Sequence, residues 1–399
     1  MSLRVIYMEM GLVMNQHFLE NFSEKNSGVE FWWDSSPLIL DEWKESFFKK
    51  LDKTKKNFFL NFFNNLISEN NPGSQFFLGA TTNPVLAWKV VQSNEEYWKK
   101  FVQSQKKVSS TNSDGLFWAL YQEIAKLGAE KFLPLYEFSE KQYGYISVQM
   151  DIRDMHDSDI MIEKAEELAE LSPNIMIKVP GTAAGYEVIE KLTEKGIPTN
   201  NTLCFVYSQI ITCANAIRRG YDFAIKQGID MEGWRSVITH MEGRFGEDLE
   251  SQAKAQGVYL NEGELRLAEL AIFKKAYRYI KCRGISTKLL SCSLRIGPTL
   301  NEKQKMWHLE HKRGSNIVVT CPPLFLEQLT LLDLEYEDNF SIDDQISPTV
   351  MEKLFKIASF VDSYEENGFS PEDYSRLPVF EKTKSEHLLA TIEFLEFVS

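Results

Sequence analysis

Residues 174–205 read NIMIKVPGTAAGYEVIEKLTEKGIPTNNTLCF. This stretch begins with a short apolar run at 175–179, continues with a helical pattern at about 183–195, and returns to an apolar run at 202–206. A strand, a helix and a second strand in this order are typical of a parallel β-sheet. Lys178 interrupts the first strand. Because a buried cation is costly, this lysine must be paired, solvated in a cavity or kept neutral for chemistry.

The same alternation recurs on both sides of this unit. Further apolar runs lie at 30–34, 75–84, 144–150, 236–241, 287–293 and 316–321. Together with the first two runs they make eight candidate strands, each separated from the next by a helical pattern. Eight such units favour an α/β fold of the (β/α)8 TIM-barrel type, although an open doubly wound sheet shows the same alternation.

The domain organisation follows from the same pattern. We predict a single domain over 1–399, with the barrel at about 30–335 and a helical extension at about 340–399. The extension contains helical patterns at 348–362, after 371 and at 385–398, and no strand candidate. A long helical pattern covers 39–69, and the polar stretch 106–115 predicts a surface loop.

Composition and charge narrow the class of protein. The chain has 399 residues, 43% hydrophobic and 25% charged, with a formal net charge of −13. Such a charge argues against nucleic acid and anionic membranes as partners. Five cysteines, an odd number with no CxxC pair, predict reduced thiols in a cytoplasmic protein without structural zinc. Glu9 interrupts the apolar N-terminal stretch 1–18, which predicts neither a signal peptide nor a membrane span.

Polar side chains gather where the predicted strands end. The set comprises Asp34, Thr81, Asn83, Gln149, Asp151, Lys178, Asn200, Thr202, Thr239, Arg244, Ser293 and Arg295. Interior positions of a barrel are ordinarily Val, Ile or Leu, and active sites of barrels lie at the carboxyl ends of the strands. The polar set therefore predicts a functional cavity at that end.

The residue types in this set point to a chemistry. A desolvated lysine has a lowered pKa, so its free amine can attack a carbonyl and form a Schiff base. Asp34 is the candidate base that removes a hydroxyl proton, and Arg244 and Arg295 are suited to bind a phosphate. We predict a Schiff-base aldol enzyme acting on a phosphorylated sugar. The alternatives are a snorkelling or salt-bridged Lys178, a helix-capping Asp34 and arginines in surface ion pairs.

At this point the sequence resembles the transaldolase family, in its longer-chain form, over roughly residues 30–325. The similar segments are FWWD (31–34), GATTNPVLAW (79–88), YISVQMDIR (145–153), NIMIKVPGTAAGYEVIEKL (174–192), GIPTNNTLCF (196–205), THMEGR (239–244) and SCSLR (291–295). The resemblance implies transfer of a dihydroxyacetone unit from a ketose phosphate to an aldose phosphate, a reaction of pentose-phosphate carbohydrate metabolism. It implies no metal and no organic cofactor, and it leaves the oligomeric state open.

The resemblance also implies a role for each matching residue. Lys178 matches the Schiff-base lysine, and Asp34 matches the acid/base aspartate. Residues that match the lining of the dihydroxyacetone site are Thr81, Asn83, Asn200 and Thr202, and Thr239 falls where the family usually has serine. The phosphate-binding set is matched by Arg244, Ser293 and Arg295.

Three positions depart from the family pattern. Gln149 stands where transaldolases have a glutamate that, with a threonine such as Thr202, positions and activates the catalytic water; glutamine can orient a water but is a poor proton acceptor. Met241 replaces the usual phenylalanine, and Gly79 the usual aspartate. Fructose-6-phosphate aldolases also have glutamine at the Gln149 position, paired with a tyrosine where this chain has Met241. The alternatives are therefore an aldolase of that type and a catalytically silent sugar-phosphate-binding relative.

Overall fold

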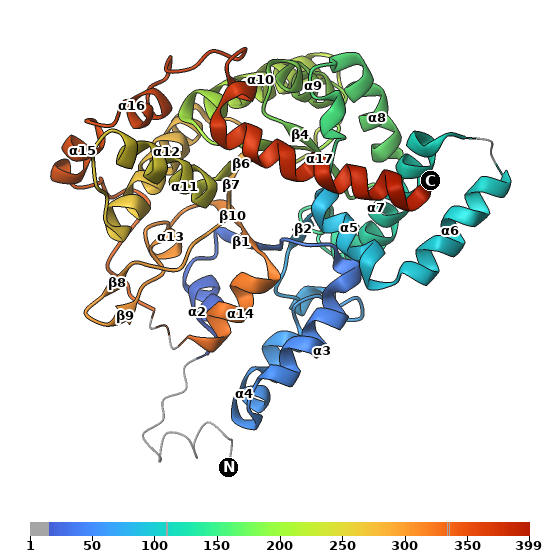
Figure 1. The fold of residues 1–399 in the computed structure, drawn as a ribbon, viewed down its shortest axis with the longest axis horizontal. Helices are drawn as coiled ribbons and strands as arrows, with labels where there is room; N and C mark the ends of the chain where they lie inside the picture. Colours follow the sequence, from blue (N-terminus) through green and yellow to red (C-terminus); the bar gives the residue numbers. More distant parts are fainter. Residues whose placement is uncertain (1–15, 109–110, 333, 335) are drawn as a thin grey trace.

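The computed structural model describes residues 16–108, 111–332, 334 and 336–399. Eight parallel strands form a closed barrel in the order β1-β10-β7-β6-β5-β4-β3-β2 (Figure 1). Their bounds are β1 (Val29–Trp33), β2 (Gly79–Thr81), β3 (Tyr145–Gln149), β4 (Ile175–Pro180), β5 (Thr199–Cys204), β6 (Ser236–Met241), β7 (Lys288–Cys292) and β10 (Ile317–Cys321). Each predicted run overlaps one of these strands, and the predicted (β/α)8 fold is confirmed.

Helices surround the barrel, so most strand residues are buried on both faces, which explains their apolar runs. The helices between the strands are α3 (Leu40–Lys50), α4 (Lys53–Asn64), α5 (Pro84–Ser93), α6 (Glu95–Val108), α7 (Ser113–Phe138), α8 (Ser158–Glu170), α9 (Ala183–Glu194), α10 (Tyr207–Lys226), α11 (Glu242–Ala255), α12 (Glu262–Arg283) and α13 (Trp307–Glu310). Near the two ends of the chain lie α2 (Phe18–Lys25), α14 (Pro323–Leu331), α15 (Pro348–Leu354), α16 (Ala358–Tyr364) and α17 (Pro378–Val398). Short 3-10 turns complete the set: η1 (Pro37–Ile39), η2 (Pro72–Ser74), η3 (Ile152–Asp154) and η4 (Tyr374–Arg376).

The register of the strands pairs three polar residues on neighbouring strands. Gln149 on β3 pairs with Lys178 on β4, and Lys178 pairs with Asn200 on β5. All three are at least 90% buried. Register partners on neighbouring parallel strands point to the same side of the sheet, so these three side chains form a row on adjacent strands near the carboxyl ends.

Several predicted boundaries were wrong. β5 begins at Thr199 rather than at 202, because the polar side chains of Asn200 and Asn201, which hydrogen-bond to residues of β3 and β4, break the apolar pattern. The predicted helix over 39–69 is two helices, since Asp52 caps a new start by accepting from the backbone N–H groups of Thr54 and Lys55. Much of the predicted loop 106–115 is helical, because α6 continues to Val108 and α7 begins at Ser113. The hairpin of β8 (Thr299–Leu300) and β9 (Lys303–Gln304) was not predicted.

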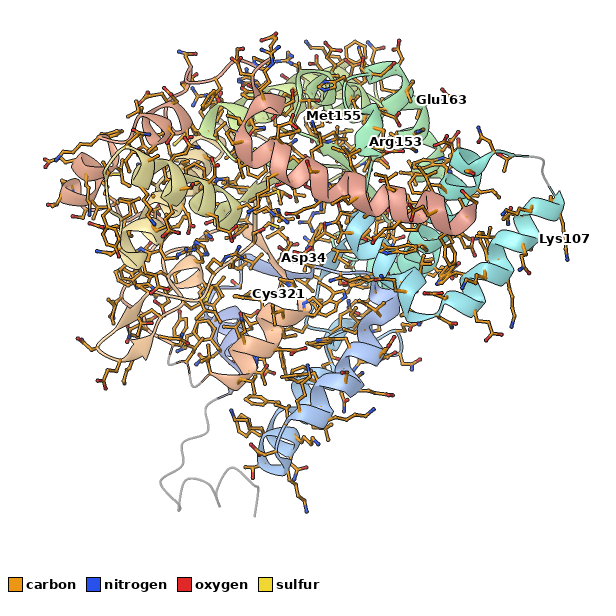
Figure 2. All side chains as sticks on the ribbon, viewed as in Figure 1. Asp34, Lys107, Arg153, Met155, Glu163 and Cys321 are labelled. Carbon is orange, nitrogen blue, oxygen red and sulfur yellow. The ribbon has the colours of Figure 1, made fainter. Side chains whose placement is uncertain are left out.

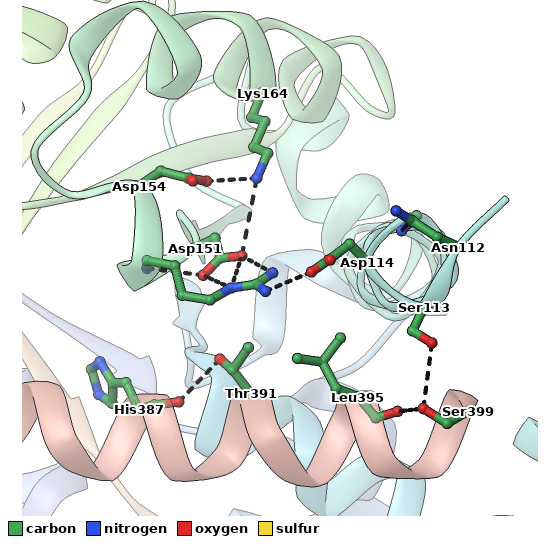
Figure 3. A network of polar contacts seen from close by, with 12 residues as sticks. Asn112, Ser113, Asp114, Asp151, Asp154, Lys164, His387, Thr391, Leu395 and Ser399 are labelled. Carbon is green, nitrogen blue, oxygen red and sulfur yellow. Dashed lines mark hydrogen bonds and ion pairs between the residues drawn. The ribbon is translucent and has the colours of Figure 1, made fainter.

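The C-terminal segment crosses the barrel. The predicted helix over 348–362 is divided into α15 and α16, and α17 starts at Pro378 rather than at 385. Figure 1 shows α17, in red, running over the barrel toward α7. The ring of Phe394 packs edge-on against Trp88 of α5 and Phe117 of α7, with centroids 5.1 and 5.4 Å apart. The C-terminal Ser399 lies 3.3 Å from the Ser113 hydroxyl (Figure 3).

The stretch 1–18, predicted to be neither a signal peptide nor a span, lies mostly outside the described residues. Within the described ranges, no helix combines the length and apolar character needed to cross a bilayer.

Candidate active site

Lys178 lies inside the barrel, and only 6% of its surface is exposed. Its Nζ donates hydrogen bonds to Thr81 Oγ1 at 3.0 Å and to the Thr82 carbonyl at 3.2 Å. In the part of the chain that the structure describes, no carboxylate lies within ion-pair distance of this amine. Burial lowers the pKa of Lys178, and the charge of Asp34 acts in the opposite direction. Lys178 is therefore neither exposed to bulk water nor held in a direct salt bridge.

Asp34 follows β1 directly, and its backbone N–H continues the strand pairing by donating to the Cys321 carbonyl at 3.1 Å. Figure 2 shows Asp34 and Cys321 close together near the middle of the molecule. Burial raises the pKa of the Asp34 carboxyl, and the nearby charge of Lys178 and a hydrogen bond from Thr320 oppose this. A carboxyl with a raised pKa exchanges protons nearer neutral pH than an ordinary aspartate does.

A layer of amides and hydroxyls lies beside Lys178. The Asn200 amide donates to Ser147 Oγ at 2.9 Å, and Thr239 Oγ1 donates to Asn200 Oδ1 at 2.7 Å. Thr202 is buried two residues further along β5 than Asn200, opposite Pro180. Asn83 instead caps α5, where its Oδ1 accepts from the Leu86 backbone N–H at 2.9 Å. Most of the predicted polar layer thus meets in one place, whereas Asn83 serves the helix start.

Gln149 contacts a residue that the sequence analysis did not single out. Its Nε2 lies 2.8 Å from Nδ1 of His387, which α17 brings to the barrel from 238 positions away in the chain. Burial lowers the pKa of His387 to about 3, with the charges of Lys178 and Arg244 acting in the same direction. The imidazole is therefore neutral at pH 7, so Nδ1 can accept the Gln149 N–H. Gln149 Oε1 is buried without a hydrogen-bond partner among the described residues.

Both predicted phosphate-binding arginines are paired with carboxylates. Arg244, in the first turn of α11, donates to Glu386 of α17 at 3.0 and 2.6 Å. Arg295, after β7, forms an ion pair with Glu247. The Arg295 backbone N–H also donates to His308 Nδ1 at 2.9 Å, which fixes the loop after Ser293. Both arginines therefore form ion pairs, which is the alternative considered for them from the sequence.

Cys292 lies beside Asp34, whereas Asp151 is held elsewhere. Cys292 is partly exposed, and its Sγ lies 3.9 Å from Asp34 Oδ2. Asp151 does not face Lys178, because Arg153 holds it through contacts of 2.6–3.1 Å, and Lys164 lies 4.0 Å away. Figure 3 shows Asp151, Asp154 and Lys164 in this separate network alongside α17. The residues around Cys292 and Asp151 in the sequence gave no indication of which of the two lies beside Asp34.

The candidate site offers amine, carboxyl, amide and guanidinium groups rather than a ligand set for a metal. Among the described residues, no group of three or more His, Cys, Asp or Glu side chains lies close enough together to hold a metal ion.

The closed parallel barrel carries a desolvated lysine, a neighbouring carboxyl and two arginines near the carboxyl ends of its strands. These are the groups of a barrel enzyme that acts on a carbonyl compound. The family model for transaldolase/fructose-6-phosphate aldolase matches residues 67–368. Because this match covers most of the chain, the protein belongs to the transaldolase/fructose-6-phosphate aldolase family.

Individual relatives are more distant. The chain is 27% identical to "Transaldolase 1" of Streptomyces avermitilis over 208 residues, which are 51% of this chain and 54% of the relative. It is 30% identical to the transaldolase of Campylobacter jejuni over 189 residues, which are 45% of this chain and 55% of the relative. The chain thus spans about half the length of these curated relatives.

Proposed function

We propose that the protein is a transaldolase that transfers a dihydroxyacetone unit from a ketose phosphate to an aldose phosphate through a Schiff base on Lys178. The observation that carries this proposal is the buried amine of Lys178, which is hydrogen-bonded to Thr81 and lies near Asp34 without a direct salt bridge. Family membership supports the reaction class. We place the reaction in the cytoplasm, which the five unpaired cysteines support.

In the proposed mechanism, the neutral Lys178 amine attacks the C2 carbonyl of the ketose and water leaves, which forms a protonated Schiff base. Asp34 then removes the C4 hydroxyl proton, and the C3–C4 bond breaks with its electrons moving toward the iminium nitrogen. The aldehyde fragment leaves, and the three-carbon enamine attacks the aldehyde of the acceptor. Asp34 returns its proton to the new hydroxyl, and water releases the product from Lys178.

The remaining polar residues have supporting roles in this proposal. Thr81, Asn200 and Thr239 line the dihydroxyacetone unit, and Asn83, whose Oδ1 caps α5, contacts this unit through its amide nitrogen. Thr202 and Gln149 orient the water that forms and hydrolyses the Schiff base. Arg244, Ser293 and Arg295 bind the phosphate of the sugar.

The test is borohydride trapping of the complete protein with ketose phosphates, read by intact mass and peptide mapping. We expect a three-carbon adduct on the peptide that contains Lys178. A protein that binds sugar phosphates, seen as thermal stabilisation, but gives no adduct with any donor would be the silent relative instead.

A fructose-6-phosphate-type aldolase is the second candidate, and Gln149 is the observation that favours it. Such an enzyme releases free dihydroxyacetone without an acceptor, whereas a transaldolase retains the three-carbon unit until an acceptor arrives. Measuring free dihydroxyacetone with and without an aldose phosphate separates the two activities. Steady release in the absence of an acceptor would replace the transferase proposal by the aldolase.

Gln149→Glu is expected to raise the rate of transfer by about tenfold, because a carboxylate accepts protons from the catalytic water and an amide does not. His387 can accommodate the change, since a neutral imidazole protonated on Nδ1 can donate to the new carboxylate. The measurement is the steady-state transfer rate at saturating donor. Gln142→Glu, at an exposed position before β3, makes the same charge change as a control. An unchanged rate in Gln149→Glu would mean that proton transfer to this position does not limit turnover.

A further inference from the structure

The carboxylate of Glu386 forms a bidentate ion pair with the guanidinium of Arg244. The two carboxylate oxygens of Glu386 accept from the two terminal nitrogens of Arg244, at 3.0 and 2.6 Å. Thr383, one turn earlier on α17, lies 3.4 Å from the same guanidinium. Two parallel N–H···O bonds are also the arrangement by which arginine binds a phosphate. Glu386 and an incoming phosphate therefore need the same donors.

The second arginine, Arg295, also has a carboxylate partner. Arg295 is paired with Glu247, and Lys382 of α17 lies 3.6 Å from the other oxygen of that carboxylate. Each of the two arginines thus has a carboxylate partner within the chain, and Glu247 is shared with Lys382. A phosphate approaching this end of the barrel competes with these carboxylates for the N–H donors of the arginines.

The backbone of α17 holds Glu386 over the site. Phe380 and Phe394, before and after Glu386 on the helix, are fully buried. At the end of the helix, Lys106 donates to the Ser399 carbonyl at 3.0 Å, and the Ser113 and Ser399 hydroxyls are in contact (Figure 3). By contrast, the Glu386 side chain is 40% exposed. Rotation of this side chain alone can free Arg244, without displacement of the helix.

We propose that Glu386 is a specificity-determining residue, which competes with substrate phosphate for Arg244 and thereby lowers the preference for phosphorylated over unphosphorylated ketose donors. This inference rests on the proposed function, because that function assigns the phosphate to Arg244. The competition is intramolecular, so Glu386 is present at Arg244 at every substrate concentration. The donor must therefore displace a carboxylate that already satisfies the guanidinium.

The first test is titration of the full chain with inorganic phosphate by calorimetry. Glu386→Gln is expected to bind phosphate about tenfold more tightly than the wild type, because an amide is a weaker partner for guanidinium than a carboxylate. Glu393→Gln, an exposed position on the same helix, is the matched control and is expected to bind as the wild type does. Adding Arg244→Ala to Glu386→Gln should abolish the gain. Equal affinities of Glu386→Gln and the wild type, equal gains in both glutamine variants, or no measurable phosphate binding by Glu386→Gln would overturn the inference.

The second test compares two donors, fructose 6-phosphate and fructose, in the steady-state transfer assay, with borohydride trapping of each donor as the check that an adduct forms. Glu386→Gln is expected to increase the ratio of kcat/KM for the phosphorylated over the unphosphorylated donor by about tenfold, mainly through KM for the phosphorylated sugar. An unchanged ratio would contradict the role of Glu386. If no donor forms an adduct with either protein, the proposed function fails, while the phosphate titration still decides the role of Glu386.

Discussion

Replacement of Lys178 by alanine is expected to abolish borohydride trapping and to lower the transfer rate by about 10⁴-fold or more, because no other group supplies the covalent electron sink. The buried amine is hydrogen-bonded only to Thr81 and to the Thr82 carbonyl among the described residues, and its pKa is lowered by burial. The measurements are the intact mass after reduction with a ketose phosphate and the steady-state rate. Lys178→Arg should be equally inactive, since a guanidinium retains its charge and does not form the Schiff base.

The rate of adduct formation on Lys178 is expected to depend on pH. Because burial holds the pKa of Lys178 below its ordinary value of 10.5, the neutral amine is present at lower pH than for an exposed lysine. The rate of adduct formation should therefore rise with pH and reach its midpoint below 10.5. Lys191→Ala serves as the control, because Lys191 is exposed on α9 and paired with Glu194. An adduct of unchanged yield in Lys178→Ala would show that another lysine is the nucleophile.

Replacement of Lys312 by alanine is expected to reduce the free energy of unfolding by about 3–5 kcal/mol, the cost of leaving a buried charge without its partner. Both Lys312 and Glu242 are fully buried, and Lys312 Nζ donates to the Glu242 oxygens at 2.7 and 2.8 Å and to Ser291 Oγ at 2.8 Å. The carboxylate of Glu242 would remain in the interior without a cation. Urea unfolding followed by circular dichroism and fluorescence measures the change.

A control variant shows whether the loss of any paired lysine lowers the free energy of unfolding to the same extent. Lys131→Ala removes an exposed ion pair with Glu69 and should cost no more than about 1 kcal/mol. The double variant Glu242→Gln with Lys312→Met should recover part of the loss, because no unpaired charge then remains. A loss below about 1 kcal/mol in Lys312→Ala would show that water reaches the carboxylate of Glu242.

The amino-acid pattern favoured the barrel over an open sheet, and it indicated many of the polar residues at the carboxyl ends of the strands. Each buried strand needs a short apolar run, and each crossover needs a helix, so the eight units are visible locally. Lys178 stood out because a lysine within such a run conflicts with burial. Gln149 and Asn200 are the register partners of Lys178, and we expected all three near one another because the carboxyl ends of parallel strands meet at one end of the barrel. The strands, the helices and the unusual lysine are each visible in residues close together in the chain, whereas the meeting of the strand ends follows from the expected barrel.

What the sequence alone did not reveal depends on contacts between distant segments. β5 begins earlier than its apolar run because Asn200 and Asn201 are polar strand residues whose amide N–H groups donate to residues of β3 and β4. His387 and Glu386 look like ordinary polar positions of a C-terminal helix, since an amphipathic pattern identifies a buried face but not what covers it. Only the packing of α17 across the strand ends brings His387 to Gln149 and Glu386 to Arg244. The pairing of a charge with its partner is a property of distance in space, and tertiary structure alone decides that distance.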